Sequence, residues 1–187
     1  GQSEGQLKTK ADFYEFSLHW AISILNRTNE NLIISEGITI LIEITDSYCY
    51  DPNLLFPLFN SIFAKKYDDE LFTTFSIFLR KLIQKGISFD EYIPNFFEMA
   101  NSNPQSNIRD FGLQILGQIA ENCRGELING EFIKNLVTCS LQNIQKNESY
   151  TAVYVINQLV TGCCKLPEFH EYFNSIEIMG ILLEYLK

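Results

Sequence analysis

Side chains that commonly carry catalysis or bind metal ions are few in this sequence and widely spaced. Its only histidines, His19 and His170, lie far apart, and neither belongs to an HExxH motif or a zinc-binding Cys/His cluster. The sequence has no G-x-x-x-x-G-K-S/T phosphate loop, no G-x-G-x-x-G dinucleotide fingerprint and no G-x-S-x-G nucleophile elbow. We therefore expect no catalytic residue, no metal site and no cofactor, and a surface or helix-capping role for His19.

The cysteines do not form a pattern typical of disulfides or metal ligands. No C-x-x-C motif occurs, and their number is odd: Cys49, Cys123, Cys139, Cys163 and Cys164. This usage favours a reducing compartment, the cytoplasm or the nucleus. The neighbours Cys163 and Cys164 would point about 100° apart on a helix, so they would not share a ligand direction. We expect Cys163 in the core and Cys164 near a helix end.

The charge of the chain restricts the class of partner. The formal net charge is −9 and no basic cluster occurs, whereas phosphate groups are bound mainly through Lys and Arg. We therefore expect no nucleic-acid partner and no membrane partner, and a slight preference for a basic partner surface. No apolar run reaches the roughly 18 residues that a membrane span requires. The densest acidic run, Asp68–Glu70, precedes an apolar segment, where it suits the dipole of a helix N-terminus.

The elements that would position these side chains are predicted to be helices. Apolar residues recur at intervals of three and four along Phe13–Ile24, Leu71–Leu82, Phe111–Ile119 and Ala152–Leu159. Turn-forming residues separate these stretches, and no alternating strand pattern of useful length occurs. The sequence predicts an all-α fold, with a disordered tail or cloning remnant over residues 1–7 and a single domain over residues 8–187.

Self-similarity indicates that the helices repeat. A shift of 40 positions places apolar residues of Leu113–Cys123 on those of Val153–Cys163, and a shift of 45 places Ile133–Leu141 on Ile178–Leu186. A unit of about 40 residues cannot bury its apolar face alone, so stacked units would share a continuous core. Such a stack is an α-solenoid, or α-α superhelix. A closed helical bundle is the alternative architecture.

Two stretches, Asn107–Leu141 and Ser149–Leu186, resemble armadillo repeats. Each contains a long helix, a loop, a short turn and a second helix rich in apolar residues, and Asn31–Ile44 resembles the later part of such a unit. The resemblance covers about two thirds of the chain and implies an armadillo-like superhelix. HEAT repeats are the close alternative. The family binds many protein partners, so the resemblance also implies a protein-binding role.

One departure from the armadillo pattern bears on function. Nuclear-import adaptors of this family carry a Trp, and an Asn four residues later, on each third helix, where they grip an extended basic signal peptide. The matching positions here hold Gln114 and Gln118 in one repeat, then Tyr154 and Gln158 in the next. Recognition of a classical import signal is therefore not expected. We expect the lone tryptophan, Trp20, to lie in the core.

Third helices line the groove of an armadillo fold, so polar residues on the matching segments are the candidate partner-binding residues. Gln side chains can bond to peptide groups, and Tyr offers a flat contact with a polar tip. Spacing of i, i+4 places pairs of them on matching faces. The candidates are Asp110, Gln114, Gln118, Glu121, Tyr154, Gln158 and Thr161.

The sequence thus predicts a non-enzymatic scaffold or adaptor. It would present a helical-repeat groove to another protein, whose bound segment is basic or extended. A fragment of a nuclear-transport-factor-like protein and an enzyme of unrecognised class are the alternatives.

Overall fold

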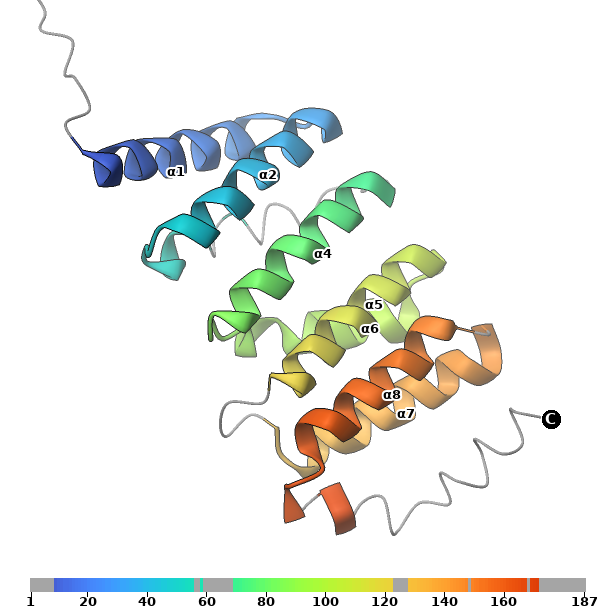
Figure 1. Cartoon of the computed structure of the whole chain (residues 1–187). Coiled ribbons are helices and arrows are strands. Elements are labelled where there is room, and N and C mark those ends of the chain that lie inside the picture. Colours follow the sequence, from blue (N-terminus) through green and yellow to red (C-terminus); the bar gives the residue numbers. More distant parts are fainter. Residues whose placement is uncertain are drawn as a thin grey trace, which may run out of the picture. The chain divides into compact units, whose positions relative to one another are not determined.

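The computed structural model describes residues 9–55, 58, 69–122, 128–147, 149–167 and 169–171, which form helices and turns and contain no strand (Figure 1). The all-α prediction is confirmed over these residues. The four stretches with helical periodicity lie in α1, α4, α6 and α8. The elements are α1 (Lys10–Arg27), α2 (Asn31–Ser47), η1 (Pro52–Leu54), α4 (Asp69–Gln84), η2 (Asp90–Tyr92), α5 (Ile93–Ser102), α6 (Ser106–Glu121), α7 (Gly130–Asn147) and α8 (Tyr150–Cys163).

Contacts within the chain group it into two compact units, Gly1–Leu82 and Ile83–Lys187. The expectation of a single domain over residues 8–187 stays a prediction. The predicted tail over residues 1–7 and the predicted repeat helix over Ile178–Leu186 lie outside the described residues. Asp69 and Glu70 lie at the start of α4, as the acidic run suggested, whereas Asp68 is not among the described residues.

In the first unit, α1 packs against α2 through one apolar face. Thr9 and Asp12 form a capping box at the start of α1: the Thr9 hydroxyl accepts from the Asp12 amide at 3.1 Å, and the Asp12 carboxylate accepts from the Thr9 amide at 2.9 Å. The approach of the helices is close, because a β-carbon at Gly37 would lie 2.9 Å from a methyl group of Leu25. The side chains of Ser35 and Thr74, 3.1 Å apart, and an ion pair between Lys81 and Asp46 connect α2 with α4.

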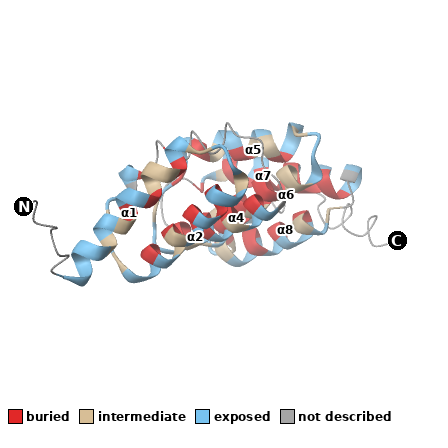
Figure 2. Cartoon of the chain, turned by 90° about the horizontal axis from the view of Figure 1, so that it is seen from above, coloured by how far each residue is buried: buried red, intermediate tan, exposed pale blue. Residues whose placement is uncertain are grey.

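Trp20 is not a core residue, contrary to the prediction. Its side chain is 49% exposed, and Phe13 and Phe16 on the same helix are also exposed. Figure 2 shows that much of α1 is exposed, in pale blue. The face of α1 that is buried carries Leu18, Ala21 and Leu25 instead. The apolar periodicity predicted the helix correctly. However, α1 carries two apolar faces, one aromatic and one aliphatic, and the aliphatic face is the one that is buried. His19 is exposed, as expected.

The second unit consists of two helical hairpins, α5–α6 and α7–α8, which stack with α5 beside α7 and α6 beside α8. Helices α6 and α8 run in parallel. The Ser149 hydroxyl at the start of α8 donates to Asp110 in α6 at 2.8 Å, and the Gln158 amide donates to Glu121 near the end of α6 at 2.7 Å. These bonds join residues 39 and 37 positions apart, close to the 40-position repeat seen in the sequence.

Glycines allow α6 to approach its neighbours at the distance of backbone contact. A β-carbon at position 162 of α8 would lie 2.0 Å from the Ala120 carbonyl oxygen, and one at position 112 would lie 2.6 Å from the Phe96 carbonyl oxygen. Both obstacles are backbone atoms, which cannot turn aside as a side chain can. Cys163 is fully buried beside the same carbonyl of Ala120, and Cys164 follows at the C-cap of α8, as expected.

A buried asparagine completes the C-terminal end of α5. Pro104 has no N–H group, so it cannot donate to the carbonyl of Ala100, four residues earlier in the chain. The Asn143 side chain of α7 supplies the missing donor, at 3.0 Å from the Ala100 carbonyl oxygen. Asn143 is 3% exposed. This bond therefore fixes α7 against α5 by satisfying a helix end that the chain leaves open.

We expect Gly162→Ala to destabilise the protein by about 2 kcal/mol, because overpacking against a fixed backbone outweighs the roughly 1 kcal/mol by which Ala favours a helix over Gly. Urea unfolding followed by circular dichroism measures the change. Thr161→Ala is the matched control, since Thr161 is the exposed neighbour. Its effect should stay within about 0.5 kcal/mol. A more stable Gly162→Ala protein would show that the close contact is absent.

We expect Asn143→Ala to cost about 1–3 kcal/mol, the range for a buried group left without its hydrogen-bond partner. The same unfolding measurement applies. Asn135→Ala on the exposed side of α7 is the control and should change stability little. Equal effects of the two substitutions would contradict the role of the Ala100 carbonyl.

Candidate functional site

Two of the predicted partner-binding residues, Gln118 and Gln158, are buried inside the fold. Gln118 and Gln158 are 7% and 2% exposed, between α6 and α8. One oxygen of the Glu121 carboxylate accepts from both amides, at 3.4 Å from Gln118 and 2.7 Å from Gln158. The other polar atom of Gln158, Oε1, has no hydrogen-bond partner among the described residues and lies 2.3 Å from where a β-carbon of Gly117 would stand.

The expectation that Gln118 and Gln158 face a partner is therefore corrected. Both residues lie on the faces through which parallel α6 and α8 contact each other, whereas Gln114 and Tyr154, four residues before them, are partly buried and exposed, respectively. Arginine at both positions would place two charges in this interface and disrupt folding, so loss of binding in such a variant would not identify a partner-binding surface.

The other five candidates have varied surroundings. Asp110 is partly buried and accepts the bond from Ser149, and Gln114 is also partly buried. Glu121, Tyr154 and Thr161 are exposed, and the Thr161 hydroxyl donates to the Asn157 carbonyl within α8. Partner contact at these five residues stays a prediction.

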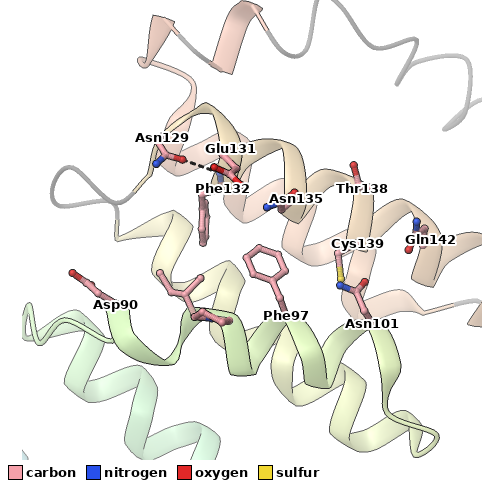
Figure 3. A pocket seen from close by; sticks show the side chains of 12 residues that line it. Asp90, Phe97, Asn101, Asn129, Glu131, Phe132, Asn135, Thr138, Cys139 and Gln142 are labelled. Carbon is pink, nitrogen blue, oxygen red and sulfur yellow. Dashed lines mark hydrogen bonds between the residues drawn. The ribbon is translucent and has the colours of Figure 1, made fainter.

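An open pocket lies elsewhere in the second unit, between α5 and α7 (Figure 3). Its volume is about 700 Å³, within the range of ligand sites in proteins. We call it the α5–α7 pocket. It is lined by Asp90, Ile93, Pro94, Phe97, Asn101, Asn129, Glu131, Phe132, Asn135, Thr138, Cys139 and Gln142.

One end of the α5–α7 pocket is acidic. Asp90 of η2 and Glu131 in the first turn of α7 lie toward this end (Figure 3). The Asp90 carboxylate accepts a hydrogen bond from the Ser88 hydroxyl. Asp90 is exposed, but desolvation by the groups around it raises the pKa of its carboxyl above its usual value, and repulsion from Glu91 adds to this effect. Asn129 caps α7 by accepting from the Phe132 amide at 2.9 Å, so it is occupied within the fold.

Aromatic rings form the middle of the pocket. Phe97 of α5 and Phe132 of α7 meet edge to face, with ring centroids 5.8 Å apart (Figure 3). Phe132 is buried, whereas Phe97 is only partly so. Ile93 and Pro94 add apolar surface nearby. This region can accept an apolar side chain without loss of any hydrogen bond.

The other end of the pocket carries amide groups. Asn101 of α5 and Gln142 of α7 are exposed there, and neither side chain forms a hydrogen bond within the part of the chain that the structure describes. Each amide offers both donors and an acceptor, which is the pattern that pairs with a peptide group. The wall beside them includes the buried Cys139, close to Asn143.

The lining of the pocket repeats from α5 to α7. Asp90 and Glu131 are 41 positions apart, and so are Asn101 and Gln142. Pro94 with Asn135, and Phe97 with Thr138, have the same separation. Six residues of α7 line the pocket, and four of them, at positions 131, 135, 138 and 142, follow the spacing of one helix face. The sequence contained this signal, but alignment by apolar residues alone passed over it, because the shared features are acids and amides.

The described residues bring together no group of three or more His, Cys, Asp or Glu side chains that could hold a metal ion. Crossing a lipid bilayer requires a longer or more apolar helix than any that these residues form.

We expect Cys139 to resist alkylation in the native protein. Burial raises the pKa of its thiol to about 12, and a hydrogen bond from Asn143 opposes this only in part. At pH 8 the thiolate fraction would then be about 10⁻⁴, and thiolate is the reacting form. Iodoacetamide labelling read by peptide mass spectrometry should modify the exposed Cys49 at least about 100-fold faster than Cys139. The difference should vanish in urea; equal native rates would refute the burial.

No family model matches this chain, and neither the curated proteins nor the solved structures compared with it include a match. The armadillo or HEAT resemblance therefore stays an expectation from the sequence. The function has to be argued from the geometry of the described residues.

Proposed function

We propose that this chain is a non-enzymatic scaffold or adaptor that binds a segment of another protein in the α5–α7 pocket. The observation that carries the proposal is the repeated lining of that pocket, with an acid and an amide contributed at equivalent positions by each of two stacked helical hairpins. Repeat proteins bind extended partners through equivalent positions on successive units, because the partner then meets the same chemistry at regular intervals.

The composition of the pocket supports protein binding over a reaction. Apolar rings lie at its centre and side chains with unused hydrogen-bonding capacity lie at its end, which is the composition of a recognition site. Its one thiol is held in the protonated form by burial, so it is a poor nucleophile. An armadillo- or HEAT-like solenoid is the architecture we propose for the whole chain, and the cytoplasm or nucleus its location. The stacking of α5–α6 on α7–α8 is consistent with that architecture.

Selection from a random peptide library displayed on phage tests this proposal. We expect peptides that bind the wild-type chain and lose affinity about 10-fold or more with Gln142→Arg, because the longer side chain enters the pocket. A tenfold loss corresponds to about 1.4 kcal/mol. Fluorescence polarisation of the selected peptides gives the dissociation constants.

Gln145→Arg is the matched control. Gln145 is an exposed glutamine on the same helix and does not line the pocket, so the substitution adds the same charge without blocking the site. Peptide affinity should be unchanged. Failure to select any peptide, or equal effects of the two arginine substitutions, would reject the pocket as a protein-binding site.

A further inference from the structure

The acidic end of the α5–α7 pocket can hold a cation. Asp90 and Glu131 both line this end, Asp90 from η2 and Glu131 from α7, and none of the lining residues is Lys, Arg or His. The N-termini of α5 and α7 oppose a cation, but each contributes only about half a unit of positive charge. Two carboxylates therefore leave this end negative. The formal net charge of −9 for the chain acts in the same direction at longer range.

The aromatic centre lies next to this acidic end. Glu131 and Phe132 are adjacent on α7, and the Phe132 ring contacts the partly exposed Phe97 ring. A ligand that places a positive charge at the acidic end of the pocket would therefore place its next groups on an apolar surface. The methylene stem of Lys or Arg suits the boundary between the two regions, because it packs on apolar surface while its charged end stays in the polar region.

The distance from the acids to the amides sets the length of the ligand. Glu131 and Gln142 are 11 positions apart on one helix, which is about 16 Å at a rise of 1.5 Å per residue. An extended peptide advances about 3.3 Å per residue, so about five residues would span the pocket. Asn101 and Gln142 at the far end can each bond to a peptide group of such a segment.

We propose that the α5–α7 pocket binds an extended protein segment of about five residues, with a Lys or Arg side chain at the acidic end that Asp90 and Glu131 line and a large apolar side chain against Phe97. This inference rests on the proposed protein-binding function and adds the chemistry of the ligand. An acidic or purely apolar segment is not the expected ligand, because it would leave the two carboxylates without a cation.

Positional-scanning pools of pentapeptides with blocked ends test the chemistry. Each pool fixes one residue at one position. Binding of a pool to the wild-type chain is measured by its competition with a labelled peptide, chosen because Gln142→Arg weakens the binding of that peptide. We expect pools with Lys or Arg near one end to bind about 10-fold or more tightly than pools with Glu there. Pools with Phe or Leu at an interior position should exceed those with Asp or Ser. The preference for Lys or Arg should weaken as salt is added.

The double variant Asp90→Asn, Glu131→Gln should lose the preference for Lys or Arg while it keeps the preference for an apolar residue. Glu98→Gln is the control, because Glu98 is an exposed acid of α5 outside the pocket lining. Circular dichroism verifies that all variants fold. A preference that survives in the double variant, or equal binding of basic and acidic pools, would overturn this inference and leave the proposed protein-binding function intact. Binding of no pool at all would reject both.

Discussion

The second unit depends on how closely α6 and α8 approach each other. At Gly162 the backbone of α6 occupies the space where any side chain would stand, and Gly117 leaves room for the Gln158 side chain. This contact favours a parallel alignment with an offset near 40 positions, because a register that put a larger residue at either glycine position would clash with the neighbouring helix. Each helix is the second half of a hairpin, so the same offset sets α5 beside α7 and fixes which of their residues face each other.

Polar groups inside this unit specify the arrangement further. Pro104 leaves the Ala100 carbonyl without a donor, and Asn143 supplies one from α7. The Glu121 carboxylate accepts hydrogen bonds from the side-chain amides of Gln118 in α6 and Gln158 in α8. A buried polar group without a partner costs about 1–3 kcal/mol, so a shift in register that separated these pairs would be unfavourable. Apolar packing drives the helices together, and these bonds select one alignment among several that apolar residues alone would permit.

The alignment has a chemical consequence on the other side of the hairpins. The α5–α7 pocket has an acid from each hairpin toward one end and an amide from each toward the other, and the members of each pair are 41 positions apart in the sequence. Rings from both helices fill the space between them. The chemistry of the pocket therefore changes from acidic at one end, through apolar at the centre, to amide groups at the other end. A peptide chain is a common biological ligand that presents charge, apolar surface and backbone polarity along one line.

The amino-acid sequence by itself determined the local structure: the helical periodicity of α1, α4, α6 and α8, the exposure of His19, and the burial of Cys163. The periodicity follows from neighbours within a few residues and correctly predicted the exposure of His19 and the burial of Cys163, although the packing of α8 on α6 is what buries Cys163. The tertiary structure decided which face of each helix is used. It buries Gln118 and Gln158, exposes Trp20, and opens a pocket between α5 and α7 rather than along α6 and α8. A helix face is defined by what packs on it, and the glycine contact between α6 and α8 is a property of two segments about 40 residues apart, which neither segment contains alone.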